Sequence, residues 1–354
     1  MATYIPFTAG DTVDSIDRVF ASAWSGGTVN DLADQGFFSS STQYVTDTST
    51  SSGAFHMEIY DKNPQSDDTA EVQFSIAYGN RVGSGSLDFT SGVGSEGFSA
   101  AKSTYNQYRN LVFGGDETQN FSFDGHIPDH IYIINVNRAR YKNALRLGNI
   151  ALHLSGTVAQ NLLELTDDSI TTSGSANAIR AGVGREFNIV SGSAGERVGS
   201  NNTFVTDSGS YGFIYPDAGF IILNGDALDA TKADGGIGLG TTLTPNNNGK
   251  NPIKLQNALI RNGSSFILDS QEDIASKFYF IRVKNQEFNY TTNDSFSLND
   301  GTLRFDSMID NPETYITTVG LYNDNQDLLA VAKLSQPLPK DFTKEALIKV
   351  KLDY

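Results

Sequence analysis

Alternation of apolar and polar residues runs to the last residue of the chain, and it is the feature that most constrains the fold. In the closing stretch "ALIKVKLDY", every second side chain from Ile348 onward is apolar, and lysine or aspartate stands between them. This period of two places the apolar side chains on one face of an extended strand. Because chain ends fray unless pairing holds them, we expect residues 347–354 to form a terminal strand fixed in a sheet.

A second strong signal precedes this strand, in "TYITTVGLYNDNQDLLAVAKLS". Two apolar runs flank the polar stretch "NDNQD", whose Asn and Asp residues favour a turn. The pattern predicts a hairpin over residues 315–334. The same reasoning predicts further strands at residues 55–60, 72–78, 131–136, 265–268, 278–284 and 302–305, the first two of which are joined by a polar hairpin loop.

The composition agrees with many short strands. Charged residues are only 19% of the chain and hydrophobic residues 38%, and 34 glycines together with abundant Ser, Thr, Asn and Asp favour turns. The 22 Phe and 15 Tyr still supply a core. We therefore expect a mainly β fold of β-sandwich-like sheets with a few short helices and a minor α+β, multi-domain character.

Two segments have helical spacing. Residues 12–23 place Val13, Ile16 and Val19 at helical intervals after Asp11, a possible cap, and Trp24 is expected to anchor this segment to the body of the protein. The better helix candidate is residues 98–112. A short helix that ends at Gly148 is expected after the strand at 131–136.

These elements suggest four parts. Residues 1–53 are expected to form an extended assembly arm with a short helix, and residues 54–155 a β-rich domain. Residues 156–260 are expected to be a β- and loop-rich domain with a long exposed loop at 226–250, and residues 261–354 a C-terminal β domain. The Ser- and Thr-rich arm is the segment we expect to order only on assembly.

Net charge and cysteine content exclude several classes of function. The formal net charge is −16, which disfavours direct binding to nucleic acid. The chain has no cysteine, so disulfides and thiolate sites are excluded. We expect no signal peptide and no membrane span, because no basic leader and no run of 18 apolar residues occurs, and hence synthesis in a cytosol.

One stretch brings possible metal ligands together. In "DGHIPDH", Asp124, His126, Asp129 and His130 fall within seven residues. Pro128 prevents the helical spacing of a zinc-binding pair, and metal ligands usually converge from several parts of a fold. We expect a turn that leads into the strand at Ile131, and no metal.

The other candidate motifs are weaker. "GGIGLG" at residues 235–240 lacks the helix that a phosphate-binding loop needs, so we expect a flexible loop and no cofactor. The serines of "GSGS" lack the frame of a nucleophile elbow. A glycosidase pair among 41 acidic residues stays open, since spatial separation defines it. We expect no catalytic residues.

Five stretches spread over the chain belong together: "AEVQFSIAYGNRVGSGS", "YNQYRNLVF", "HIYIINVNRARYKNALRLGN", "GFIYPDAGFIILN" and "NPETYITTVGLYNDNQDLLAVAKLSQPLPKDFTKEALIKVKLDY". With these stretches the chain resembles a known family, the virion structural proteins of contractile-tailed marine cyanophages, from whose sequences it departs in "LRLGNIALHLSG". The last stretch, which ends the chain, carries the resemblance most strongly.

This resemblance implies a non-enzymatic component of the virion, most plausibly in the tail or baseplate, whose partners are other virion structural proteins and copies of itself. Two alternatives stay open: a carbohydrate-binding or degrading receptor protein at the tail tip, and a structural protein of the neck or head surface. In the leading interpretation, the C-terminal hairpin and terminal strand form a docking edge that pairs within its own sheet or adds to a neighbour's.

Overall fold

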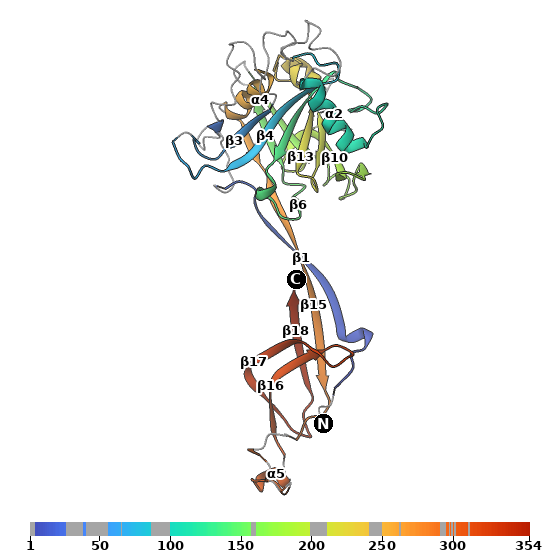
Figure 1. The fold of residues 1–354 in the computed structure, drawn as a ribbon, viewed down its shortest axis with the longest axis vertical. Coiled ribbons are helices and arrows are strands. Elements are labelled where there is room, and N and C mark those ends of the chain that lie inside the picture. Colours follow the sequence, from blue (N-terminus) through green and yellow to red (C-terminus); the bar gives the residue numbers. More distant parts are fainter. Residues whose placement is uncertain are drawn as a thin grey trace. The chain divides into compact units, whose positions relative to one another are not determined.

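The computed structural model describes residues 4–25, 38–39, 56–64, 66–85, 100–156, 161–198, 211–240, 250–261, 263–290, 295–296, 298, 300, 302–310 and 312–354. The chain forms two compact units (Figure 1). Unit 1 comprises Met1–Arg18 and Asp273–Tyr354, and unit 2 comprises Val19–Glu272. These two units differ from the four expected parts: the N-terminal segment is shared between the units, and residues 54–155 and 156–260 contribute strands to one sheet.

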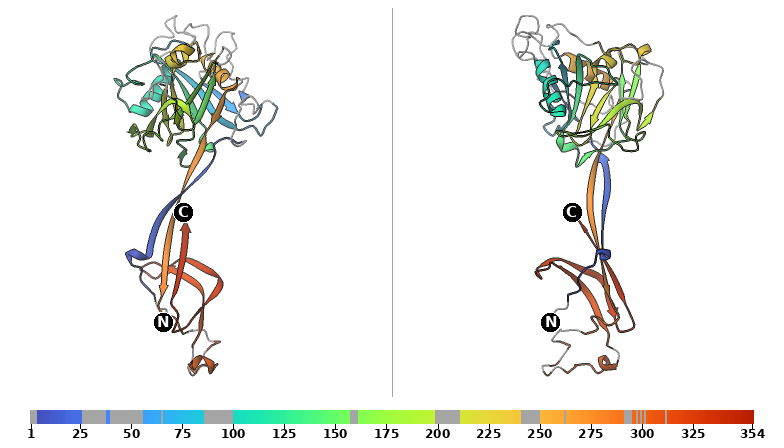
Figure 2. Two further views of the ribbon diagram at one scale, coloured as in Figure 1. Left: turned by 180° about the vertical axis from the view of Figure 1, so that it is seen from behind. Right: turned by 90° about the vertical axis from the view of Figure 1, so that its right-hand side faces the viewer.

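Unit 2 is built on a 12-stranded antiparallel sheet that curls on itself (Figure 2). Its main path runs through β14 (Ser265–Ile267), β7 (Ala151–Ser155), β8 (Leu162–Asp167), β10 (Gly184–Ser193), β12 (Gly212–Tyr215), β13 (Phe220–Asn224), β5 (His130–Val136), β4 (Val72–Asn80), β3 (His56–Tyr60) and β2 (Phe38–Ser39). The short strands β9 (Ala178–Arg180) and β11 (Glu196–Arg197) pair with β10. The expected mainly β fold is confirmed, as are the strands at 55–60, 72–78, 131–136 and 265–268.

Both faces of the central strands are buried, which explains their continuous apolar sequences. In β5, Tyr132 and Ile134 belong to one core cluster, while Ile131 and Ile133 belong to a second. The helix α2 (Ala100–Phe113), close to the predicted 98–112, contributes Tyr105 and Val112 to the second cluster. The first cluster receives residues of α3 (Gly225–Asp229) and α4 (Lys250–Ile260).

The predicted exposed loop at 226–250 is wrong over its described part. Residues 225–240 contain α3 and a 3-10 turn, η4 (Lys232–Asp234), and then return to the core through buried Ile237 and Leu239. Residues 241–249 lie outside the described residues. The helix α4 had not been predicted, although Leu255, Ala258 and Leu259 have helical spacing and are all buried.

The predicted helix at residues 12–23 is also wrong, because this segment is the strand β1 (Thr12–Ser22). It lies beside β15 (Asp269–Val283) in the sheet, and long-range pairing overrides the helical spacing. Asp11 ends a different turn, η1 (Ala9–Asp11), where it accepts a hydrogen bond from the Thr8 amide at 2.8 Å. Trp24 does anchor the segment, since it is 4% exposed and donates to the carbonyl of Phe266 at 2.7 Å.

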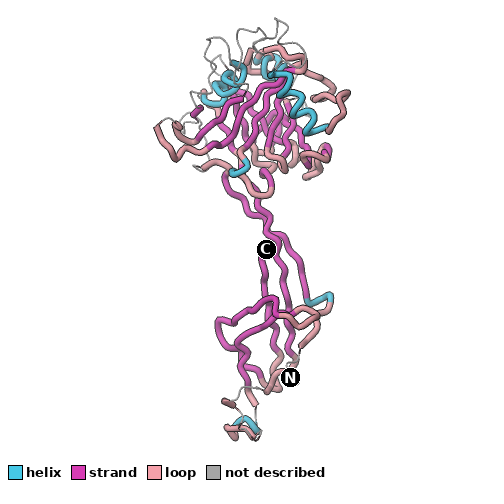
Figure 3. Tube along the Cα trace, in the orientation of Figure 1, coloured by secondary structure: helices cyan, strands magenta, loops and turns pink. Residues whose placement is uncertain are grey.

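Unit 1 consists mainly of strands (Figure 3). The terminal strand β18 (Ala346–Asp353) pairs antiparallel with β15, and β16 (Thr314–Tyr322) pairs with β17 (Leu328–Lys340). The predicted hairpin and terminal strand are therefore confirmed, and the strand predicted at 278–284 is part of the longer β15. The sheet order is β1-β15-β18, and β6 (Ala144–Leu145) also pairs with β15.

Two smaller predictions fail. The segment at 302–305 is no strand and precedes the short helix α5 (Ser307–Asp310), and Phe305 is exposed. The helix expected to end at Gly148 is reduced to a 3-10 turn, η3 (Arg138–Arg140), because the chain then extends into β6. Gly148 has φ +75°, which suits the turn that follows β6.

Unit 2 contains a fully buried acid that makes a stability test possible. Glu186 on β10 is 0% exposed, and it accepts hydrogen bonds from the Arg180 guanidinium at 2.9 Å and from the Tyr215 hydroxyl at 2.8 Å. Its carboxylate also accepts from the Asn177 amide. Removal of this carboxylate would therefore leave all of these donors without that hydrogen bond.

We predict that Glu186→Ala lowers the free energy of unfolding by about 2 kcal/mol, because it leaves the buried Tyr215 hydroxyl and the partly exposed Arg180 guanidinium without their acceptor. Urea denaturation of the full chain measures this change. Glu196→Ala is the matched control, since Glu196 is exposed on β11, and it should change the free energy by less than about 0.5 kcal/mol. Equal effects of the two substitutions would contradict the prediction.

Candidate functional site

The His- and Asp-containing stretch at 124–130 forms the predicted turn into β5. Asp124 and Gly125 both have positive φ, and Phe123 and His126 bridge across them. The sequence alone did not reveal that this turn meets α3. The strand β13 ends at Asn224, which caps α3, and Asp226 is the second residue of that helix. An acid in the first turn interacts favourably with the helix dipole.

The two histidines share the acids of α3. His126 Nε2 lies 2.8 Å from Asp226 Oδ2, and His130 Nδ1 lies 3.4 Å from Asp226 Oδ1. His130 Nε2 lies 3.2 Å from Asp229 Oδ2. These contacts join the turn to α3 by ion pairing when the rings are protonated. Within the described ranges, no group of three or more His, Cys, Asp or Glu side chains has the arrangement of a metal site.

His153 lies elsewhere in unit 2, on β7. Its Nε2 is 2.9 Å from the Ser193 hydroxyl and its Nδ1 is 2.9 Å from the Ser265 hydroxyl. Burial lowers the pKa of His153, and the charge of Glu164 opposes that effect. A neutral imidazole offers one donor and one acceptor, which two hydroxyl groups satisfy. This histidine therefore joins three strands of the sheet. Although Glu164 is its cross-strand neighbour, both ring nitrogens bond to serine hydroxyls, whereas the histidine of a catalytic triad bonds to a carboxylate.

The glycine-rich stretch at 235–240 is ordered, so the predicted flexible loop is wrong. The amides of Gly236, Ile237, Gly238 and Leu239 all donate to backbone carbonyls of residues 228–231. A phosphate-binding loop needs such amides directed at the anion. Here they hold the segment against α3, and the buried side chains of Ile237 and Leu239 complete the core.

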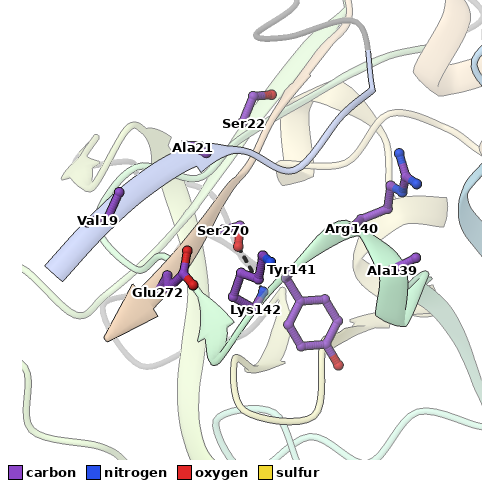
Figure 4. Close-up of a pocket in the computed structure, with 9 residues that line it drawn as sticks. All are labelled: Val19, Ala21, Ser22, Ala139, Arg140, Tyr141, Lys142, Ser270 and Glu272. Carbon is purple, nitrogen blue, oxygen red and sulfur yellow. Dashed lines mark hydrogen bonds between the residues drawn. The ribbon is translucent and has the colours of Figure 1, made fainter. Parts of the chain in front are cut away.

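A small cavity of about 160 Å³ lies in unit 2 beside β1 and β15 (Figure 4). Its charged lining residues are Arg140, Lys142 and Glu272. Arg140 pairs with Glu71 at 2.8 Å, and the Lys142 amide donates to the Ser270 hydroxyl at 2.9 Å. Ligand pockets usually occupy about 300–1,000 Å³. The cavity is too small for a cofactor, and its lining contains only one carboxylate, whereas glycosidases use two.

The hairpin of unit 1 carries the more distinctive surface. Its inner side chains, such as Leu321 on β16 and Leu334 on β17, pack with Ile348 and Val350 of β18. Its outer face is also apolar. Five large side chains there are 43–68% exposed: Tyr315, Tyr322, Leu328, Leu329 and Val331.

Charge is nearly absent from this outer face. The hairpin has two acids, Asp324 and Asp327, both in the turn, and two lysines, Lys333 and Lys340. Lys340 is fully buried and donates through Nζ to three oxygen atoms of Asn285, Asn289 and Asp341, which fixes the base of the hairpin. An apolar surface depleted in charge is typical of the core of a protein interface.

Comparison with known proteins gives no further guide: no family model, no curated protein and no solved structure matches the chain. The resemblance to cyanophage virion proteins therefore stays a prediction. In the described part of the chain, no helix is long and apolar enough to cross a membrane. The outer face of the hairpin is the candidate functional surface, and the sequence signalled it through apolar residues on both faces of "TYITTVGLY".

The protonation of His153 can be tested through the pH dependence of the free energy of unfolding. Because its folded-state pKa is lowered, the fold favours the neutral ring, and that contribution to stability is complete above the unfolded pKa of about 6.5. It is lost as the pH falls through the folded-state pKa. We predict that His153→Gln unfolds with a smaller loss of stability between pH 7.5 and pH 5 than the natural chain.

The measurement is urea denaturation at both pH values, and His56→Gln, at an exposed position on β3, is the control. The control should keep the full pH dependence of the natural chain. An unchanged pH dependence in His153→Gln would contradict the assignment of a neutral, partly buried ring.

Proposed function

We propose that this protein is a non-enzymatic structural component of the virion of a contractile-tailed cyanophage, in the tail or baseplate, that acts through protein–protein interfaces. The single observation that carries the proposal is the exposed apolar face of the hairpin β16–β17. This hairpin lies within residues 311–354, the segment in which the sequence resembles such proteins most strongly.

The distribution of apolar side chains supports an assembly role. Among the described residues of unit 1, only Leu321, Ile348 and Val350 form a buried apolar cluster, although the unit exposes most of the large apolar side chains that the structure leaves accessible. A soluble monomer gains little from such an arrangement. A protein that is completed by neighbouring chains gains the free energy of burying these side chains on assembly.

Two classes of partner fit this surface: other virion structural proteins and copies of the same chain. Nucleic acid does not, because the chain carries a net charge of −16. The alternative of a carbohydrate-degrading protein gains no support from the described cavity, in which Glu272 is the only acid.

The test is mass spectrometry of purified phage particles whose tails have been separated from the heads. We predict that the chain is found in the tail fraction in a fixed ratio to the other tail proteins. It should release no reducing sugar from the host polysaccharide. Detection only in the lysate of infected cells, and never in particles, would contradict the proposal.

A further inference from the structure

Unit 1 has four outer strand edges, and three of them carry residues that discourage pairing with another chain. Charges lie along β1 and β18, for example Asp14 and Asp17 on β1 and Lys349 on β18. The strand β17 carries Pro337 and Pro339, which lack the amide hydrogen that an added strand would need. Charged side chains and prolines on edge strands are the usual means by which proteins prevent edge-to-edge association.

The fourth edge, that of β16, has no such protection. The strand reads "TYITTVGLY" over nine residues, without a charged residue or a proline. In the part of the chain that the structure describes, β17 is its only strand neighbour. Thr, Tyr, Ile and Val favour extended structure. An exposed, uncharged edge of this length associates with another strand unless something covers it.

We infer that β16 pairs antiparallel with β16 of a second copy of the chain, so that two hairpins form one four-stranded sheet across a twofold axis. This inference rests on the proposed function, and it adds that the neighbour is a second copy of the chain and that the contact is made by β16. Strand addition supplies backbone hydrogen bonds, and the side chains on each face of the new sheet supply specificity.

Charge favours a second copy as the occupant. Each copy carries a net charge of −16, so two copies repel each other over most of their surface. The hairpin balances two acids with two lysines, and β16 itself has no charge. Like-charged chains meet at the lowest Coulomb cost where charge is absent. A basic partner would instead gain most by docking on acidic surface elsewhere.

The pattern of inner and outer side chains selects the register. Tyr315 and Tyr322 are exposed on the outer face, whereas Ile316 and Leu321 pack inward. Val319 also packs inward and both Thr317 and Thr318 are exposed, so the alternation of β16 shifts by one residue between Ile316 and Val319. With the two threonines taken as one position of the ladder, an axis at Val319 places Tyr315 of one copy opposite Tyr322 of the other. It also places Ile316 opposite Leu321. Both ends of the strand then match apolar side chains on the same face, as cross-strand pairing requires. An irregularity in the β16–β17 ladder lies between Ile316 and Thr318, next to the centre of this pairing.

Pairing of two β16 edges covers their backbone groups and brings Tyr315 of each copy against Tyr322 of the other. Leu328, Leu329 and Val331 stand on β17, one strand farther from the axis, and stay exposed on the outer face. Strand addition of this kind gains its affinity mainly from main-chain hydrogen bonds. The apolar side chains of β17 are then available to a further neighbour in an assembly.

The test uses single cysteines, since the natural chain has none. Tyr315→Cys and Tyr322→Cys are each made in the full chain, and each is oxidised alone and in an equal mixture. We expect disulfide-linked dimers in the mixture and almost none in either variant alone. In the inferred register residue 315 faces residue 322 of the other copy, while identical positions lie about 23 Å apart along the strand.

A second variant guards against loss of folding by the cysteine variants. Thr317→Lys places two like charges near the twofold axis and should weaken dimer formation at least tenfold in sedimentation equilibrium. Ser335→Lys, at an exposed position on β17, should leave it unchanged. Circular dichroism checks that all four variants fold.

Mixed dimers together with the Thr317→Lys effect would support the inference. It is overturned if the folded cysteine variants form no mixed dimer, if each crosslinks equally well with itself, or if the natural chain is monomeric at all concentrations. The proposed function has a separate outcome: mixed dimers from a chain that is absent from purified particles would refute the function and leave the pairing intact. The reverse result would refute only the pairing.

Discussion

Burial of apolar surface is the constraint on which the rest of this structure depends, and the two units meet it differently. In unit 2 a single curled sheet has both faces covered, one by Trp24 and residues of α3 and α4, the other by α2. Because both faces are covered, continuous apolar strands such as "FIILN" can be fully buried. Among the described residues of unit 1, Tyr4 packs against Tyr322, and most of the outer face of the hairpin stays exposed.

The polar groups of unit 2 follow from the same constraint. A buried polar group must find partners inside the protein, and Glu186 finds three donors around β10. His153 finds two hydroxyl groups, and the histidines of the 124–130 turn find the acids of α3. In the described residues these groups stabilise the sheet and its connections. The proposed function is carried by the exposed face of the hairpin in unit 1.

The spacing of apolar residues predicted those strands and helices whose pattern is clear within a short stretch of sequence. Period-two alternation predicted the hairpin and the terminal strand, and amphipathic spacing predicted α2. It failed for β1, where Val13, Ile16 and Val19 fit a helix equally well and pairing with β15, some 250 residues away, decides the outcome. The contact between His130 and Asp229 could not be predicted for the same reason, since the two residues are distant in the sequence. Residues 226–240 were mistaken for an exposed loop because they contain few large apolar residues, yet Leu228, Ile237 and Leu239 are all buried.

We propose that the outer edge of β16 is covered by a second copy of the chain when the protein assembles. Hydrogen exchange of the backbone amides of β16, measured by mass spectrometry over a wide range of protein concentration, tests it most directly. We predict that the amides that point away from β17 exchange slowly in concentrated protein and much faster on dilution, while those bonded to β17 change little. Rapid exchange of the outward amides at every concentration, and in assembled particles, would contradict the account.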